Sequence, residues 1–493
     1  MKKIVTASLV AAMALTTVNA SSLENRLSDL ETELADVKKK LKKQNRKINK
    51  VKAHDAGDNI KWGVDLRTAM DVINYDLADG TSLKNDDLMS LRLWLNMEYA
   101  PDENNVFKGQ LSMNKAFGAD FTGQRGHSFG SLFDWIGNEA LTDNALKVRQ
   151  AYWLYLGEEF FGAEIPWTFS LGRRPSTGGF LANLREDDVE NSPLGHVINV
   201  EFDGLSSKID LSTVTGIQGM SFKVCMGKGS TNARPVLDAA QYATSNVASS
   251  DIKDINLGGV IFEPYNDGQF ITKASWYRGY NVPDANVGPT GLLTGFSTVG
   301  DMEGAAFSIL IDGLAEDGFL SDTKIFGSFA WTKSHPNGGT VTFPDGLGGT
   351  FDLPGMLGST ESETGTSFWV GAVLPVVEDG VLGLEYNHGS EYWRPFTYAE
   401  DTMSGSKLAA RGDAYEAYFT YQLTEALSAQ IRYTQVDYEY TGSLGFFGST
   451  SGQSQKISDV KAAAAAGNPA AQATLANIVE TSTDARFYIR YRF

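Results

Sequence analysis

The last ten residues, 484–493, alternate between apolar or aromatic side chains on one face and mostly arginine on the other. A repeat of two predicts a β-strand, because successive side chains of a strand point to opposite sides. A closed barrel in a membrane accommodates both faces, since lipid accepts the aromatic rings and a wet lumen accepts the arginines. The apolar face is Phe487, Ile489, Tyr491 and Phe493, and the opposite face is Arg486, Tyr488, Arg490 and Arg492.

The same alternation recurs along the chain from Ile60 onward. Segments of about ten residues with charges on one face suit a tilted membrane strand better than the five or six residues typical of soluble sheets. We therefore predict strands at 60–71, 88–100, 106–117, 146–157, 164–174, 196–203, 205–227, 254–263, 270–280, 303–312, 323–333, 367–377, 381–391, 413–423, 427–439 and 484–493.

The connections between these segments predict how the strands are arranged. Outer-membrane barrels have short periplasmic turns and longer outer loops. Treating 205–227 as one strand places the long connections, including 175–195 and 228–253, on the outside, whereas two strands there would place 228–253 in the periplasm. The predicted fold class is therefore an all-β transmembrane barrel of about 16 antiparallel strands. Residues 60–493 are expected to form it, with both termini in the periplasm.

The outer connection 440–483 contains an alanine-rich stretch, 461–476. Gly467 can end one helix there, because glycine readily adopts the left-handed conformation that follows a helix. Asn468 followed by Pro469 is a favourable cap and first position for a second helix. The stretch predicts a small helical hairpin on this loop.

A different period precedes the barrel. From 21 to 52, apolar residues recur at alternating intervals of four and three, without Gly or Pro. About four such heptads predict a short α-helical coiled coil in the periplasm, and leucine at most of the alternate core positions favours three or more helices. A single amphipathic helix packed on a domain is the alternative. Residues 53–59, which include Gly57, are expected to form a linker.

The first twenty residues have the pattern of a secretory signal peptide. Lys2 and Lys3 are followed by an apolar run from Ile4 to Val18 that is too short to span a membrane, and Ala20 supplies a small residue at the cleavage position. The expected domains are a signal peptide at 1–20, a coiled coil at 21–52, a linker at 53–59 and a β-barrel at 60–493.

Composition narrows the classes of protein. The chain carries 42 basic and 60 acidic residues, which argues against nucleic acid as a partner. Cys225 is the only cysteine, so no intrachain disulfide can form. After the signal, no run of 18 or more apolar residues follows, which argues against a helical inner-membrane protein.

A barrel of this predicted size has an interior too wide for side chains to fill, so an aqueous channel is expected. The candidate constriction is the third outer loop, which a pair of arginines enters beside a bend rich in Gly and Pro and which continues into an acidic run. Inward-facing arginines of the chain-end strands would form the opposite wall. The loop residues are Arg173, Arg174, Arg185, Glu186, Asp187 and Asp188, and the wall residues are Arg67, Arg92, Arg149, Arg432, Arg486 and Arg490. The alternative is that these charges only solvate a wet wall.

Motifs for catalysis are weak. None of the five histidines begins a metal-ligand spacing, and no nucleophile elbow occurs. We therefore predict no catalytic residue, no cofactor and no metal.

Taken together, the strand pattern resembles trimeric Gram-negative porins over nearly the whole mature chain, and the heptad segment resembles that of phosphate-selective porins. The stretch 172–179 (GRRPSTGG) resembles one in an uncharacterised porin-like family. The resemblance implies a homotrimer in outer-membrane lipid, a C-terminal strand read by the barrel-assembly machinery, and an acidic third loop folded into the lumen. An evident lysine-rich lumen ladder like that of phosphate-selective porins is absent from the sequence.

The function expected is that of an outer-membrane porin, a passive diffusion channel for small hydrophilic solutes or ions. The alternative is a non-channel surface protein, either an adhesin that binds through 440–483 or a barrel enzyme that uses His196 or His388. Ion preference stays open, because the acidic excess favours cations whereas the predicted wall of the constriction is basic.

Overall fold

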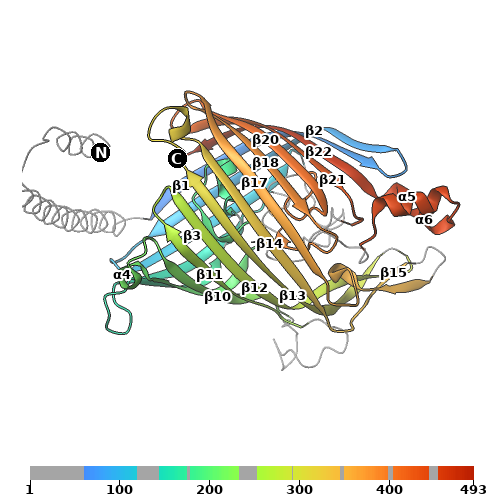
Figure 1. The fold of residues 1–493 in the computed structure, drawn as a ribbon, viewed down its shortest axis with the longest axis horizontal. Coiled ribbons are helices and arrows are strands. Elements are labelled where there is room, and N and C mark those ends of the chain that lie inside the picture. The colour runs from blue at the N-terminus through green and yellow to red at the C-terminus, as the bar shows by residue number, and fades with distance from the viewer. Residues whose placement is uncertain are drawn as a thin grey trace, which may run out of the picture. The chain divides into compact units, whose positions relative to one another are not determined.

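The alternating segments pair in sequence order into a closed antiparallel barrel (Figure 1), which confirms the predicted fold class. The computed structural model describes residues 60–118, 141, 144–174, 178–231, 253–290, 292–344, 349–397, 403–442 and 454–493. Within those residues the barrel has sixteen strands. They are β1 (Lys61–Leu77), β2 (Ser82–Tyr99), β3 (Asn105–Ala116), β4 (Lys147–Gly157), β5 (Trp167–Arg174), β9 (Phe202–Asp210), β10 (Ser221–Ser230), β11 (Ile255–Asn266), β12 (Phe270–Val287), β13 (Leu293–Asp312), β14 (Lys324–Pro336), β17 (Thr364–Val377), β18 (Gly380–Gly389), β20 (Gly412–Gln422), β21 (Leu427–Tyr438) and β22 (Val479–Arg492).

The strand number agrees with the prediction only because two errors cancel. The predicted strand 196–203 is wrong, since most of it lies inside the lumen and contributes the two-residue β8 (Ile198–Asn199). The predicted single strand 205–227 is also wrong, because it is β9 and β10 joined by a turn that contains α4 (Ser212–Thr215). Residues 196–201 are buried without alternation, as expected of a segment packed on all sides rather than a wall strand.

Several strands continue well beyond their predicted ends. The predicted loop 72–87 is largely a ladder in which Tyr75 pairs with Leu83, and β12 and β13 continue to Val287 and Leu293. The β1–β2 extension carries polar residues such as Asp76 and Ser82 and is exposed in large part, whereas residues 282–285 of the β12 extension are buried. A strand wet on both faces lacks the alternation that the prediction relied on.

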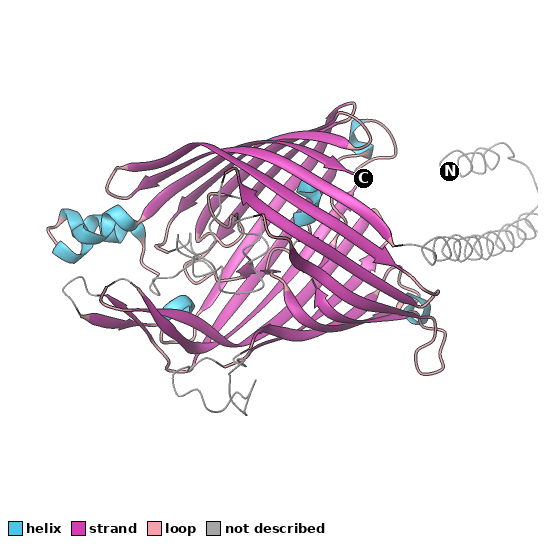
Figure 2. Ribbon diagram, turned by 180° about the vertical axis from the view of Figure 1, so that it is seen from behind, coloured by secondary structure: helices cyan, strands magenta, loops and turns pink. Residues whose placement is uncertain are grey.

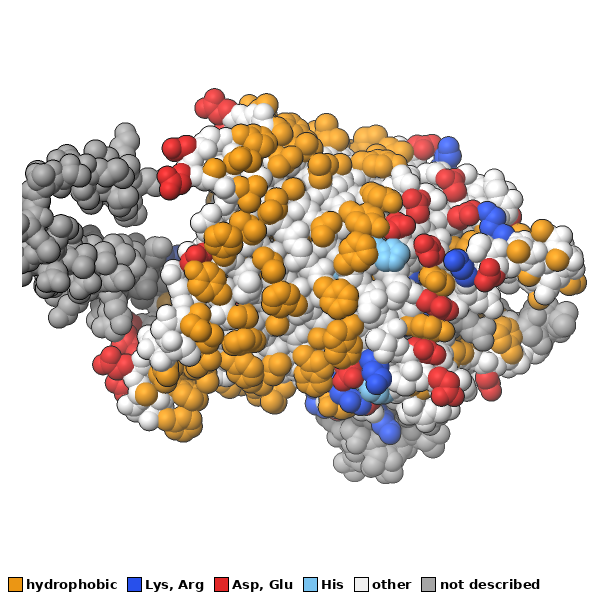
Figure 3. All heavy atoms as spheres, viewed as in Figure 1, with side chains coloured by type: hydrophobic (Ala, Val, Ile, Leu, Met, Phe, Trp, Pro, Cys, Tyr) orange, Lys and Arg blue, Asp and Glu red, His pale blue; other side chains and the backbone are white. Residues whose placement is uncertain are grey.

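The C-terminal strand closes the barrel as predicted. β22 pairs with β1 and with β21, and the backbone N–H groups of Val64 and Phe493 each donate to the other residue's carbonyl at 3.0 Å. Phe487 is 46% exposed, whereas Arg490 is 3% exposed, so the two faces of the strand point outward and inward as the sequence indicated. In Figure 3, hydrophobic side chains gather over the middle of the barrel wall, acidic ones lie toward both ends, and most basic ones lie toward the end that carries the long connections.

Replacing Phe487 with arginine is expected to lower the free energy of unfolding in lipid vesicles by about 2 to 4 kcal/mol if this face meets the bilayer midplane. Phe351 provides a matched control, because it is equally exposed, at 46%, but lies on β16 (Thr350–Leu353), outside the barrel wall. Urea titration should show no comparable loss for Phe351→Arg. Equal losses for the two variants would contradict the outward assignment of Phe487.

Part of the barrel interior is an apolar core rather than the expected aqueous space. Among the described residues, three connections enter the lumen: an inner segment defined as residues 178–201, η4 (Gly355–Leu357), and residues around β19 (Phe396–Thr397), which pairs in parallel with β8. Their apolar side chains pack together and against inward residues of the wall. Leu181, Val197, Leu357, Trp393 and Leu408 are fully buried there. An apolar core holds these connections inside the barrel.

The long connection before β22 forms the predicted helical hairpin (Figures 1 and 2), made of α5 (Ile457–Ala465) and α6 (Pro469–Thr474), followed by η6 (Leu475–Asn477). The Asn468 side chain accepts hydrogen bonds from the backbone N–H groups of Ala470 and Ala471 at 3.0 and 3.2 Å. The remaining short elements are β15 (Val341–Pro344), which pairs with β16, and η3 (Phe319–Ser321).

The predicted signal peptide, coiled coil and linker lie outside the described residues and stay predictions. Every barrel strand belongs to one compact unit, Lys61–Tyr99 with Asn104–Phe493. Among the described residues, no helix has the length and apolar character needed to cross a membrane.

Candidate functional site

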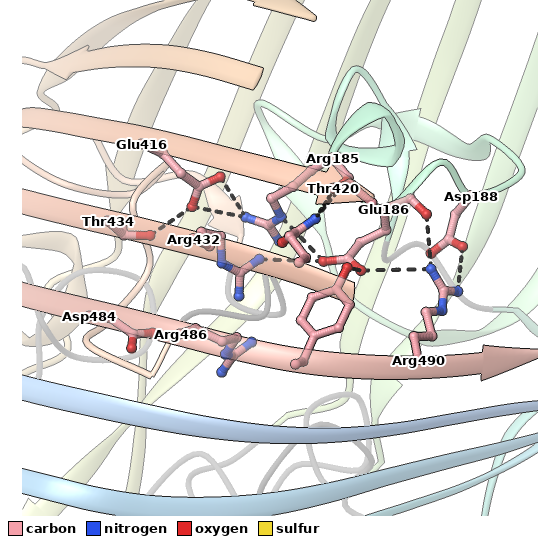
Figure 4. Close-up of polar contacts among 12 residues, drawn as sticks. Arg185, Glu186, Asp188, Glu416, Thr420, Arg432, Thr434, Asp484, Arg486 and Arg490 are labelled. Atoms are coloured by element: carbon pink, nitrogen blue, oxygen red, sulfur yellow. Dashed lines mark hydrogen bonds and ion pairs between the residues drawn. The ribbon is translucent and has the colours of Figure 1, made fainter. Parts of the chain in front are cut away.

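The inner segment crosses the lumen on a short helix, η2 (Ala182–Glu186), flanked by β6 (Gly179–Phe180) and β7 (Asn191–Leu194). Leu181 before the helix and Asp187 after it have φ values of 75° and 48°, which L-residues seldom adopt. Such strained residues persist only where surrounding structure holds them, and the complete burial of Leu181 in the apolar core provides this support. Around these two bends the side chains of Arg185, Glu186 and Asp188 point toward the barrel wall (Figure 4), whereas Asp187 is exposed.

Arg185 is held by a buried carboxylate of β20. Its Nη1 donates to Glu416 Oε1 at 3.1 Å. Glu416 also accepts from Lys407 Nζ at 2.6 Å and from Thr434 Oγ1 at 2.8 Å, and its side chain is 0% exposed. Because two cations share this carboxylate, Glu416 anchors the inner segment and the connection before β20 to the same point on the wall.

Glu186 faces the closing strands of the barrel. Its Oε1 lies 3.4 Å from Arg432 Nη1, and its Oε2 accepts from the Tyr488 hydroxyl at 2.6 Å. Its backbone carbonyl accepts from Arg490 Nη1 at 2.9 Å. The acidic loop residue is thus compensated from β21 and β22 together.

Asp188 completes the contact with β22. Its Oδ1 accepts from Arg490 Nη2 at 2.6 Å and from Arg492 Nη1 at 2.8 Å, while Arg492 also donates to the Asp187 carbonyl at 3.2 Å. Arg490 Nε donates to Asp65 on β1 at 2.9 Å. The structure therefore brings together the predicted loop residues 185–188 with two of the predicted wall residues, Arg432 and Arg490.

The other predicted wall arginines lie around this contact, and Arg92 Nη2 lies 3.4 Å from the Asp65 carboxylate that also pairs with Arg490. Arg67 lies over the Tyr488 ring, 5.4 Å from its centroid, and Arg486 is paired with Asp71 in a fully buried contact. Arg92 and Arg149 enclose the Trp94 ring at 3.6 and 4.3 Å from its centroid, on the neighbouring part of the wall.

Arg173 and Arg174 form a second cluster at the end of β5. Arg173 Nη2 lies 2.8 Å from Glu201 Oε2, and the same carboxylate lies 3.1 Å from Arg149 Nε. Arg174 lies over the Tyr152 ring and donates to Ser206 Oγ at 3.2 Å. The two arginines belong to the barrel wall beside the inner segment and lie apart from the contacts of Glu186.

Several partners in these contacts were missed from the sequence. Asp65, Asp71 and Glu416 occupy inward positions of strands, and their alternation could have revealed them. Glu201 and Lys407 come from connections, where no period indicates direction.

Water-accessible space remains beside the inner segment. A cavity of about 580 Å³ extends from Trp62 and Phe493, where the two chain-end strands meet, to Asn183 and Glu186 on the inner segment. A second cavity of about 270 Å³ shares part of its lining, including Lys108 and Asn191. The charged contacts therefore border a hydrated interior on one side and the apolar core on the other.

The two histidines considered as candidate catalytic residues, His196 and His388, lie in different surroundings. His196 is fully buried between Ser328 Oγ and Ser367 Oγ, at 2.8 and 2.9 Å from its ring nitrogens, and burial lowers the pKa of His196 to about 3. His388 Nδ1 lies 2.9 Å from Asp413 Oδ1 at a partly exposed position. Within the part of the chain that the structure describes, no group of three or more His, Cys, Asp or Glu side chains could hold a metal ion.

Comparison with solved structures finds proteins of similar fold. An anion-selective porin from Comamonas acidovorans is 10% identical, covers 88% of this chain and 99% of its own, and has a TM-score of 0.46. Pseudomonas putida OprB in its high-pH structure is 10% identical, covers 90% and 96%, and has a TM-score of 0.45. Salmonella typhi OmpF in complex with daunomycin is 12% identical, covers 89% and 99%, and has a TM-score of 0.44.

No curated protein matches the chain. The model of a family described as "Protein of unknown function (DUF3373)" matches residues 82–493, which is most of the sequence and nearly all of the barrel. The chain therefore belongs to the DUF3373 family.

Proposed function

We propose that the protein is an outer-membrane porin, a passive channel for small hydrophilic solutes or ions. The observation that carries this proposal is the charged inner segment, which Glu416, Arg432 and Arg490 hold across the lumen beside a cavity of about 580 Å³. A charged loop fixed beside a hydrated space is an arrangement that can narrow a channel and select among solutes.

The wall supports the same proposal. Outward residues of β22 are apolar or aromatic and exposed, while the inward Arg486 and Arg490 are buried. Lipid would solvate the first set, and the polar interior accommodates the second. We further propose a cleaved signal at 1–20, a periplasmic coiled coil at 21–52, a linker at 53–59, and a homotrimer assembled in outer-membrane lipid by the machinery that reads the C-terminal strand.

In this proposal the constriction lies where residues 185–188 meet the closing strands. Solutes would enter the cavity between Trp62 and the inner segment and pass paired arginines and carboxylates, which present both signs of charge within a short distance. Hydrophilic solutes can exchange hydrogen bonds with water for hydrogen bonds with these groups, whereas apolar solutes gain nothing from them.

Single-channel recording of the purified protein in planar bilayers tests this function. We expect stepwise, ohmic conductance in potassium chloride. Arg490→Ala should change the conductance and its ion preference, because Arg490 contacts Glu186 and Asp188 at the proposed constriction. Membranes that contain folded protein and show no conductance steps would overturn the channel proposal.

The alternative is a barrel that does not conduct and acts as an adhesin through the connection that carries α5 and α6. Absence of conductance, together with ligand binding that is lost when residues 454–478 are replaced by a short linker, would support this candidate instead.

A further inference from the structure

The second cavity, of about 270 Å³, is lined by positively charged side chains from five different strands. It lies between the wall and the part of the inner segment around Asn191 and Pro193. The charged groups are Lys108 on β3, Arg174 on β5, Lys208 on β9, Lys223 on β10 and Lys273 on β12. No pair of these residues is closer than fifteen positions in the sequence. The closed barrel alone brings them to one place.

Among the residues that the structure describes, two carboxylates line the same cavity, Glu190 and Glu263. Lys273 pairs with Glu190 and lies 3.8 Å from Glu263 Oε2, and Lys208 Nζ lies 3.7 Å from the same oxygen. Five cations against two carboxylates leave three formal positive charges on the lining. Lys108 Nζ also lies 3.6 Å from Glu98 Oε2 in the adjoining cavity, and positive charge still exceeds negative charge when all three carboxylates are ionised.

The lysines differ in how firmly they are held, since the Lys208 side chain is 45% exposed whereas Lys273 is part of the packed structure. Lys273 is 7% exposed, and its Nζ lies 4.6 Å from the centroid of the Phe180 ring. Phe180 belongs to the apolar core of the inner segment. Polar groups of Ser221, Asn191 and Tyr152 complete the lining and can donate further hydrogen bonds. Fixed ammonium groups in an enclosed space attract anions more strongly than mobile lysines at a surface.

The side chains that line the adjoining larger cavity also have a positive formal net charge. Seven cationic side chains and four carboxylates line it, again leaving three formal positive charges. The cations are Lys61, Arg92, Lys108, Arg149, Arg185, Arg490 and Arg492, and the carboxylates are Asp65, Glu98, Glu186 and Asp188. The whole chain has a formal net charge of −18. Its acidic excess therefore lies away from these two cavities.

We propose that the smaller cavity binds small oxyanions with more than one negative charge, such as inorganic phosphate or a short dicarboxylate. Ammonium groups converging from several directions can donate to several anionic oxygens at once, which favours a multivalent anion over chloride. The space suits this size, since a water molecule occupies about 30 Å³ in the liquid and the cavity measures about 270 Å³. The proposal names the substrate class of the proposed channel, and the binding itself does not depend on conduction.

Calorimetric titration of the full-length protein in detergent tests the binding. Inorganic phosphate is added at about 10 mM ionic strength, where charges are weakly screened, and succinate is titrated separately to compare the two kinds of oxyanion. We expect saturable binding of at least one of them that chloride does not reproduce. If chloride added at equal total charge gives the same heats as phosphate and succinate, the cavity holds only counterions, and the proposal is overturned.

Two variants locate the site, and one controls for charge. Lys208→Gln and the double change Lys208→Gln with Lys223→Gln should weaken oxyanion binding, the double change by about tenfold or more. Lys208 is the safer single change because its side chain is 45% exposed. Lys324→Gln also removes one positive charge, but Lys324 pairs with Asp312 at 2.5 Å outside the cavity, so its binding should match that of wild type. Equal weakening in Lys208→Gln and Lys324→Gln would mean that only net charge matters and would contradict the site.

Bilayer recording separates this proposal from the proposed function. In a conducting wild type, phosphate should reduce the chloride current, and less so in Lys208→Gln. Binding without any conductance would support the site and reject the channel. Conductance without oxyanion binding would support the channel and reject the site.

Discussion

Replacing Glu416 with glutamine is expected to lower the free energy of unfolding by about 3 to 5 kcal/mol, the usual loss when one partner of a buried ion pair is removed. The Glu416 side chain is fully buried and holds Arg185 and Lys407. A neutral side chain there leaves both cations with less compensation, although each of them is largely buried. Lys407 keeps its contact with Glu385 at 2.6 Å, so the larger effect should fall on Arg185 and the inner segment.

Two measurements check this expectation. Urea titration of the protein in vesicles reports the change in stability, and single-channel recording reports whether a released inner segment makes the current larger and noisier. Glu480→Gln is the matched control, because Glu480 and its partner Lys461 are both more than 40% exposed and such a pair contributes about 0.2 to 1 kcal/mol. A Glu416→Gln protein as stable as the control would show that the carboxylate does not anchor the segment.

Replacing Trp393 with alanine is expected to cost about 3 to 5 kcal/mol, because a large buried aromatic side chain leaves a cavity that its surroundings fill only in part. Trp393 is fully buried, its ring centroid lies 5.4 Å from that of His196, and its Nε1 donates to the Leu408 carbonyl at 2.7 Å. A Cβ added to Gly365 would lie 2.1 Å from the Trp393 backbone nitrogen, which shows how closely this connection packs on the wall.

The functional consequence should follow the loss of packing. With Trp393→Ala, the connection around β19 loses its largest apolar contact in the lumen, so the conductance should rise and fluctuate more than in wild type. Trp153→Ala is the control, because Trp153 is 43% exposed and its removal leaves the apolar core intact. A Trp393→Ala protein with unchanged current and stability would contradict the role of the core in holding the connections inside the barrel.

The hydrophobic pattern predicted the wall because the direction of a strand side chain is a local property. Phe487 and Arg490 were assigned to opposite faces from alternation alone, and the structure exposes the first and buries the second. The pattern failed at 196–203, where apolar residues are buried inside the lumen, and at 205–227, where a turn that contains α4 separates two wall strands. Residues such as Val197 and Val200 are packed inside the lumen, and an apolar run cannot by itself distinguish that environment from a wall strand.

The charged contacts, too, could be predicted from the sequence only in part. The acidic run Glu186 to Asp188 and the arginines of β21 and β22 were recognisable as opposing sets, because the barrel closes between its first and last strands. The identity of each pair was not predictable, since Arg185 and Glu416 are 231 positions apart and meet only when η2 bends into the lumen. The clustering of the lysines in the smaller cavity could not be predicted for the same reason, because they occur singly on separate strands.

From its sequence, this protein could be assigned a closed barrel, the inward and outward face of its last strand, and a helical hairpin on its last long connection. These features depend on residue spacing and on capping, which act over a few positions. The folded chain was needed to show that three connections fill part of the lumen, that Glu416 anchors the inner segment, and that lysines from four strands line one cavity. Those features depend on contacts between residues far apart in the chain, and only the closure and packing of the barrel determine which of them meet.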